Sequence, residues 1–500
     1  MSDFSIYKQH SKYRDSLLDL GISPEYNIGE VSLASLYRQV GWKIISENKK
    51  SRYPESQVNL EMKSFVKKIN GENNPRSSFD KEDLMLLINS SLSSPKMPKQ
   101  NGNAYPILYP YVPDCTLYSG AARLSGNPWN PGSLIESIVY LGCQNDEKAN
   151  ELWYDIFQKL GCDPSNGEED VLARIVTNEF QLWRTPNIVW EFSEMTRTGQ
   201  ARDEKILEFS PAKAFADDLA KILQLKDQLT RRQWLSVLES LIRIGCSAHI
   251  LWTCNLNIIV WNYLKARIYG EKITDESFLS QIQNAHIDLW KLEEKAVPII
   301  KEQIQKYIRA QISINYLIEF IEVDNSSLSL QTISGIKNFG DLLESKLANN
   351  EILRKKILVE LSKIYEEDPK LMNSTKGITK NIFEFIRYSL GQKQTADSQK
   401  RNFDQSYWLR KKGAYTSAPW IFDLGPSSIL TMVYCCSFGH EQNRTVNDLI
   451  GHLGLYGLNV SQGEFEASNL LKTLMTLQII GDSPDAEGGM IIINPFEKVK

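Results

Sequence analysis

The sequence predicts a mainly α-helical protein with several domains, on three observations. Between residues 132 and 391, apolar residues recur at spacings of three and four, which is the period of a helix with one buried face. Side chains that can cap a helix precede several of these stretches. The length of 500 residues exceeds what one hydrophobic core ordinarily serves, so we expect several cores.

The composition indicates a soluble, cytoplasmic chain. With 42% hydrophobic and 24% charged residues, it is too apolar for a disordered protein and too charged for a membrane bundle. Residues 1–19 lack the apolar stretch of a secretory signal, and the 7 cysteines include no C-x-x-C pair, which favours free thiols in a reducing compartment. Because the net charge is −4, any surface for nucleic acid must be local.

The chain begins with a helical region over residues 1–95, in which apolar spacing predicts short helices at 33–45, 58–69 and 80–92. A connection rich in Pro and Tyr follows over 96–131, where the density of prolines excludes a long helix. Trp129 and the neighbouring tyrosines form either an aromatic recognition surface or the packed join between the first two domains.

A central helical domain covers residues 132–391. A helix from Thr230 runs through the apolar stretch 244–264, which is long enough to cross a bilayer but holds polar residues that lipid could not satisfy, so we expect a core helix. Another helix is expected from Thr274 through Phe320, with a kink or a break at Pro298. Three helix starts in this domain show capping residues: Ser165 with Glu168, Ser210 followed by Pro211, and Thr230 with Gln233.

A basic linker with an exposed surface is expected over residues 392–419. From Lys380 to Tyr415 the chain has eight basic against three acidic residues, interleaved with aromatic residues. Basic side chains pair with phosphates, and aromatic rings stack on unpaired bases. In the alternative interpretation the segment is a solvated linker that its aromatic residues anchor to a domain. The candidate nucleic-acid-binding residues are Lys400, Arg401, Tyr407, Trp408, Arg410, Lys411 and Lys412.

The last domain, residues 420–500, changes from helical to strand periodicity. Three helices are expected first, beginning at Ser427 or Ser428, at Thr445 with Asp448 as its capping partner, and at Ser461 with Glu464. Two β-rich runs, 478–481 and 490–494, then flank a turn rich in Asp and Gly. This order of three helices and a hairpin resembles the winged-helix variant of the helix-turn-helix.

In the winged-helix family the third helix commonly enters the major groove, and the resemblance implies the same here. The charges of this domain do not favour contact with DNA. Residues 441–500 hold four basic against eight acidic residues, with Glu464 and Glu466 near the start of the third helix. We therefore interpret the domain as a protein-contact or dimerisation module rather than a reader of DNA. The residues suited to a groove are few: Gln462, Asn469, Lys472 and Thr473.

One pattern in the central domain is of a kind found in catalytic sites. The spacing of Arg243 and His249 resembles the R-x4-6-H pattern of HEPN ribonucleases. The resemblance implies that the histidine acts on the attacking 2′-hydroxyl and that the arginine stabilises the phosphate charge. The alternative interpretation is a core histidine and a surface arginine.

Two groups of cysteines and histidines could be considered as metal ligands, but neither has a standard spacing. Free cysteine is among the most often buried residues, so we expect buried thiols, no metal and no cofactor. The two groups are Cys246, His249 and Cys254, and Cys435, Cys436, His440 and His452.

These observations predict a non-enzymatic scaffold or adaptor subunit of a bacterial assembly that acts on nucleic acid. It would bind through the basic aromatic segment and the winged-helix module, with other protein subunits and DNA or RNA as partners and without a membrane. The alternative hypothesis is a HEPN-like ribonuclease of a toxin or phage-defence system.

Overall fold

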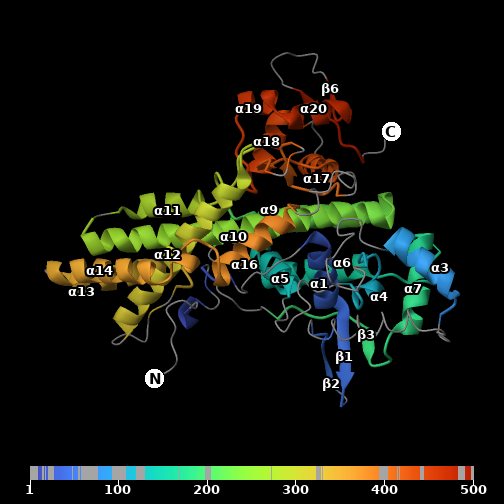
Figure 1. The fold of residues 1–500 in the computed structure, drawn as a ribbon, viewed down its shortest axis with the longest axis horizontal. Helices are drawn as coiled ribbons and strands as arrows, with labels where there is room; N and C mark the ends of the chain where they lie inside the picture. Colours follow the sequence, from blue (N-terminus) through green and yellow to red (C-terminus); the bar gives the residue numbers. More distant parts are fainter. Residues whose placement is uncertain are drawn as a thin grey trace.

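Helices dominate the structure (Figure 1), so the prediction of a mainly α-helical protein is confirmed. The structure is a computed structural model. It describes residues 10–13, 16, 18–20, 28–47, 49–54, 57, 77–92, 108–119, 130–167, 169–196, 204–271, 273–322, 328, 330–348, 350–392, 404–413, 415, 417–439, 444–481 and 490–496.

The N-terminal part is a group of helices with a small sheet at its edge. The predicted helix at 80–92 is present, with Asp80 as its N-cap, whereas 58–69 and Trp129 lie outside the described residues. Its helices are α1 (Gly29–Gly41), α3 (Lys81–Leu87) continued by a π-helical turn (Ile88–Leu92), α4 (Pro113–Thr116), α5 (Pro131–Gly142), α6 (Asp146–Leu160) and α7 (Val171–Trp183).

The expectation of a helix at 33–45 is wrong at its end, because α1 stops at Gly41 and strand β1 (Trp42–Ser46) follows. β1 lies between β2 (Lys49–Arg52) and β3 (Ile188–Trp190) in an antiparallel sheet. A Cβ on Gly41 would lie 2.4 Å from the ring of Trp190. β1 thus pairs with β3, which is far away in the sequence, as well as with β2, which follows it directly.

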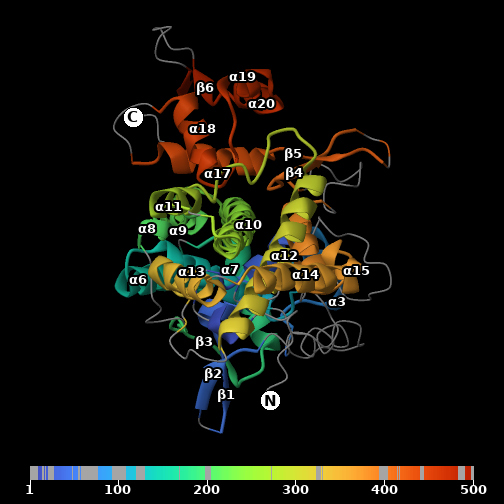
Figure 2. The same ribbon diagram turned by 90° about the vertical axis from the view of Figure 1, so that its left-hand side faces the viewer.

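Helix α10 (Arg231–Tyr269) is the long central helix of the molecule (Figures 1 and 2). The predicted caps at Thr230 and Ser210 are both present. The cap at Ser165 is wrong: Asp170 caps α7, because its carboxylate accepts from the free amide of Ala173. Around α10 lie α8 (Glu204–Leu207), α9 (Pro211–Gln224), α11 (Asp275–Gln283), α12 (Ala296–Glu322), α13 (Ile333–Leu347), α14 (Glu351–Glu367), α15 (Pro369–Met372) and α16 (Gly377–Ser389).

Within the described residues, α10 is the one helix long and apolar enough to cross a membrane by length and composition, and 78% of that apolar window is buried inside the protein. This burial is what a core helix shows. The helix predicted from Thr274 to Phe320 is divided differently than expected. The break falls between α11 and α12, and Pro298 lies in the first turn of α12, where a proline removes no helical hydrogen bond.

One cluster of buried apolar side chains extends through nearly all the described elements, from Tyr13 to Ile492, so the parts of the chain expected to have separate cores pack into one another. Only a small second cluster, around Ile308 and Leu371, is separate within the described part of the chain. The N-terminal, central and C-terminal segments pack around the same helix and share its buried faces.

The C-terminal part lies on α9 and α10 (Figures 1 and 2). The predicted capping boxes at Thr445 and Ser461 are present. The expected third helix is divided at Ser468, which is extended and caps the second piece. Its elements are β4 (Leu409–Lys411), β5 (Trp420–Phe422), α17 (Pro426–Ser437), α18 (Val446–Gly454), α19 (Gln462–Ala467), α20 (Asn469–Thr476), β6 (Ile480–Gly481) and β7 (Ile491–Ile492).

Candidate nucleic-acid interface

The basic segment forms a hairpin directly before the C-terminal helices. β4 and β5 pair antiparallel, with Leu409 opposite Phe422 and Lys411 opposite Trp420. We call residues 409–422 the β4–β5 hairpin. It lies beside α12 at the base of the C-terminal helices (Figure 2).

The base of the β4–β5 hairpin is fixed to the protein body. Trp408 is only 1% exposed, and its indole Nε1 donates a 3.1 Å hydrogen bond to the carbonyl of Ser240 in α10. Arg410 forms an ion pair with the buried carboxylate of Asp423. Burial raises the pKa of Asp423, although the Arg410 charge opposes this shift. Trp408 is therefore an anchor and offers no exposed face for a base.

The residues before the hairpin are also held inside the protein. The guanidinium of Arg243 donates to both carboxylate oxygens of Asp404, over 2.9 and 3.1 Å. Ser406 is buried as well. The expectation of an exposed linker is thus wrong for residues 404–409, apart from Gln405 and the half-buried Tyr407. Lys400 and Arg401 lie outside the described residues.

The tip of the β4–β5 hairpin carries the accessible charge. Lys411 is partly exposed, Lys412 is exposed and Tyr415 is 61% exposed. β-Bridges from Leu292 and Lys295 to β5 bring a second pair of cations to this region, Lys291 and Lys295, with Glu293 and Glu294 between them.

The sequence interpretation missed three of these residues. Tyr415 ended the basic aromatic segment and could have been included by its composition. Lys291 and Lys295 could not have been included from the sequence. They precede the hairpin by more than a hundred positions, and only the bridge pairing joins them to it.

The C-terminal helices expose a mixed surface. Of the residues suited to a groove, Gln462, Asn469 and Lys472 are exposed and Thr473 is half-buried, beside the exposed acidic Glu464 and Glu466. Three apolar side chains at the end of this region are also exposed: Met475, Leu477 and Ile493.

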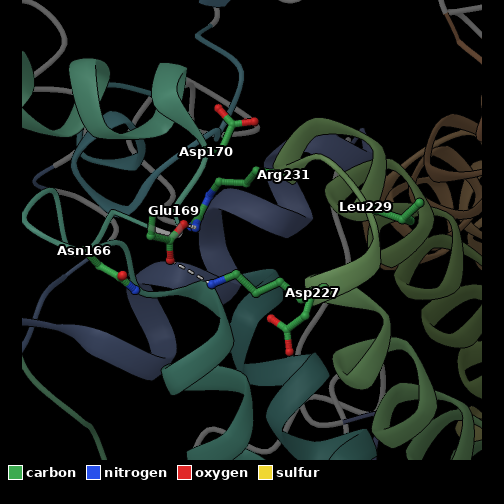
Figure 3. Close-up of a pocket in the computed structure, with 7 residues that line it drawn as sticks. Asn166, Glu169, Asp170, Asp227, Leu229 and Arg231 are labelled. Atoms are coloured by element: carbon green, nitrogen blue, oxygen red, sulfur yellow. Dashed lines mark hydrogen bonds and ion pairs between the residues drawn. The ribbon is translucent and has the colours of Figure 1, made fainter.

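A polar pocket between the N-terminal and central helices holds several charges (Figure 3). Glu169 pairs with Lys226 over 3.0 Å and with Arg231 over 3.5 Å. Arg231 is buried and also donates to the carbonyls of Tyr111 and Gly161. These cations and the carboxylate between them satisfy one another, which is the arrangement of a structural junction.

The tyrosine-rich connection is part of this junction. Tyr109, Tyr111 and Tyr118 are all buried. The hydroxyl of Tyr111 donates to Asp170 at the start of α7. Of the two alternatives for the connection, its described part is therefore the packed join between domains. These three rings form no recognition surface.

Arg243 and His249 are both buried within α10. The Arg243 side chain has no exposed surface, contrary to the expected surface arginine, and its guanidinium pairs with Asp404 and Glu239. His249 is 3% exposed, with its ring 5.6 Å from that of Trp252. In this arrangement neither side chain can reach an RNA backbone.

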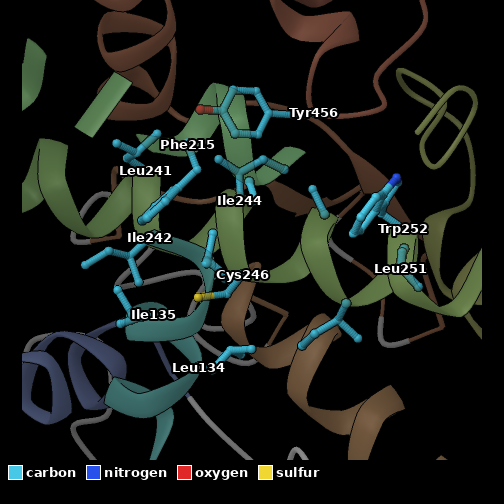
Figure 4. Close-up of a cluster of buried hydrophobic side chains, with 14 of the residues drawn as sticks. Leu134, Ile135, Phe215, Leu241, Ile242, Ile244, Cys246, Leu251, Trp252 and Tyr456 are labelled. Atoms are coloured by element: carbon cyan, nitrogen blue, oxygen red, sulfur yellow. The ribbon is translucent and has the colours of Figure 1, made fainter. Parts of the chain in front are cut away.

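All 7 cysteines are free, and Cys246 lies among the apolar side chains of the core (Figure 4). Burial raises the pKa of Cys246 and Cys254, which keeps both thiols protonated and unreactive. His440 lies outside the described residues, and among those described no three His, Cys, Asp or Glu side chains form a group that could hold a metal ion.

The described residues thus offer exposed basic and aromatic side chains at the hairpin tip, and exposed apolar and acidic side chains around α19 and α20. No protein-family model matches the chain, and no curated protein matches it.

Proposed function

We propose that this protein is a non-catalytic, cytoplasmic adaptor subunit of an assembly that acts on nucleic acid, which it contacts through the tip of the β4–β5 hairpin. The observation that carries the proposal is the exposure of Lys411, Lys412 and Tyr415 on a hairpin whose base is fixed by Trp408 and Arg410.

Binding is favoured because the hairpin holds its lysines and tyrosine in a fixed position. A flexible basic tail must lose conformational freedom when it binds, whereas a hairpin with a buried tryptophan and an ion pair at its base has already lost it during folding. The lysines can then pair with phosphates and release counterions, and the exposed tyrosine ring offers a stacking face.

The C-terminal helices have a second role in this proposal, as a winged-helix-like module that contacts another protein. Three features support this interpretation: the order of α17, α18, and the divided third helix; the β6–β7 hairpin that follows; and an antiparallel bridge that joins Thr445 to Ile491 in that hairpin. The exposed acidic and apolar side chains around α19 and α20 suit a protein partner better than a phosphate backbone.

The nucleic-acid contact is tested by the double substitution K411A/K412A in the full chain. Binding to fluorescein-labelled single-stranded and duplex oligonucleotides is followed by fluorescence anisotropy at several salt concentrations. We expect weaker binding and a salt dependence reduced by about 0.7 to 0.9 per lysine that contacts a phosphate.

The matched control is K355A/K356A, which removes the same charge from exposed lysines on α14. Equal losses in both variants would show a non-specific effect of net charge. Unchanged binding in K411A/K412A would refute the hairpin as the contact.

A further inference from the structure

A second hairpin projects from the end of the molecule opposite the C-terminal helices, as both ribbon views show (Figures 1 and 2). It consists of β1 and β2, with Ser46 opposite Lys49 at its tip. We call residues 42–52 the β1–β2 arm. Its base is fixed by β3, which pairs with the inner part of β1, while β2 has β1 as its only strand partner in the described sheet.

The β1–β2 arm is basic. Within the pairing of the two strands, Lys43 lies opposite Arg52, which places two like charges side by side. Lys50 lies two pairs further out and therefore on the same face. Lys49 is exposed at the tip. Such a cross-strand pair of cations costs stability unless anions compensate it, and here Glu191 pairs with Lys43 and Glu136 pairs with Arg52.

The partly exposed carboxylate of Glu191 pairs with two of these cations, and the arm itself also carries the exposed Glu47 at its tip. Glu191, directly after β3, lies 2.6 Å from Nζ of Lys50 and 3.6 Å from Nζ of Lys43. Arg52 is held separately by the buried Glu136. The hydrogen bond from Lys50, aided by the charge of Lys43, lowers the pKa of Glu191, so this carboxylate stays charged and competes with any anion that approaches the arm.

A ladder of aromatic rings continues from the base of the arm. Trp190 of β3 stacks on Phe157 at 5.2 Å between ring centroids, Phe157 contacts Phe192 at 5.6 Å, and Phe192 meets Tyr154 edge-on at 5.1 Å. Trp190, Phe157 and Phe192 are partly exposed and Tyr154 is 46% exposed. The outer ring of this ladder is therefore accessible.

We propose that the β1–β2 arm and this aromatic ladder form a binding surface for single-stranded nucleic acid, separate from the β4–β5 hairpin. The lysines of the arm pair with backbone phosphates, and an unpaired base stacks on Tyr154. Cations next to an accessible ring are the combination that sequence-tolerant single-strand binding uses, because every base has a face that can stack.

The ladder favours a single strand over a duplex. In a duplex the bases are already stacked on one another and only their edges are accessible in the grooves. Exposed aromatic rings gain nothing from such edges, whereas they replace the stacking that an unpaired base has lost.

The decisive experiment removes the competing carboxylate with Glu191→Gln. This change frees two lysines, so we expect the affinity of the full chain for a fluorescein-labelled oligo(dT) to rise about twofold to fivefold. Glu351→Gln is the control, because Glu351 pairs with Lys355 over 2.7 Å on the distant helix α14 and should leave the affinity unchanged.

Two further variants should lower the affinity for the oligonucleotide instead of raising it. K49A/K50A should weaken binding and reduce its salt dependence, and Tyr154→Ala should weaken it by about fivefold or more. Tyr154→Phe keeps the ring and loses only the hydroxyl that accepts from Gln158, so it should bind like the wild type.

All five variants retain Lys411 and Lys412, so failure of the β4–β5 hairpin as a contact would leave this result unaffected. Unchanged affinity in both Glu191→Gln and K49A/K50A would overturn the proposal. So would tighter binding to a duplex of the same length than to the single strand by K411A/K412A, in which the β4–β5 hairpin has lost its lysines.

Discussion

The carboxylate of Asp218 lies 2.8 Å from Nε2 of His452, although 234 positions separate the two residues in the chain. The same carboxylate oxygen accepts a 2.8 Å hydrogen bond from the hydroxyl of Tyr456, and its other oxygen lies 3.1 Å from Nζ of Lys221. This cluster joins α9 to α18, so the C-terminal helices are attached to the body by a buried polar contact as well as by apolar packing.

Substitution of Asp218 with Asn should destabilise the protein by about 1–3 kcal/mol at pH 7, because buried donors lose a charged acceptor. Burial alone would raise the pKa of Asp218, but His452, Lys221 and Tyr456 more than compensate and lower it. A lowered pKa in the folded state gives stability that is present above the unfolded value of about 3.9 and is lost as the pH falls further.

Urea unfolding of the wild type and Asp218→Asn across this pH range checks the expectation. The difference in the free energy of unfolding should shrink below about pH 4. A difference that grows on acidification would contradict the assigned shift.

Substitution of Arg243 with Ala should cost about 3–5 kcal/mol, since it leaves the buried carboxylate of Asp404 without its guanidinium. The double substitution Arg243→Met with Asp404→Leu removes both charges and should cost less than Arg243→Ala alone. Chemical denaturation of the three proteins measures both effects. A double variant that is less stable than Arg243→Ala would contradict this expectation.

Substitution of Gly391 with Ala should be costly for two reasons. Gly391 has φ +109, and a Cβ there would lie 2.7 Å from Nη2 of Arg243. Gly439 provides the control: it also has positive φ, at +77, but a Cβ there meets no atom of the described residues within 4 Å. Thermal unfolding should show Gly391→Ala to be less stable than Gly439→Ala by about 1 kcal/mol or more. Equal losses of stability in the two variants would mean that backbone strain alone accounts for the cost of each substitution.

Substitution of Trp408 with Ala should reduce stability by about 3–5 kcal/mol, because it removes a buried ring and its hydrogen bond to Ser240. Lys412→Ala, four residues away on the exposed tip, should change stability by less than about 0.5 kcal/mol. Denaturation curves of the two variants separate the anchor from the exposed tip. Similar stabilities would contradict the division of this segment into a buried base and an accessible end.

The sequence by itself determined the features that depend on neighbours a few positions away. The capping boxes at Thr230, Thr445 and Ser461 each need only a partner three residues later, so their spacing was sufficient to place these helix starts. The helical period of α10 depends on local spacing in the same way.

Only the tertiary structure decided which residues are accessible. Trp408 and Lys412 belong to one short basic segment, yet a carbonyl of α10 holds the first and solvent surrounds the second. The inner part of β1 pairs with the distant β3, and the buried Arg243 pairs with Asp404, which lies 161 positions away in the chain. Burial and strand pairing are set by contacts between distant segments, and composition or periodicity within one segment contains no record of them.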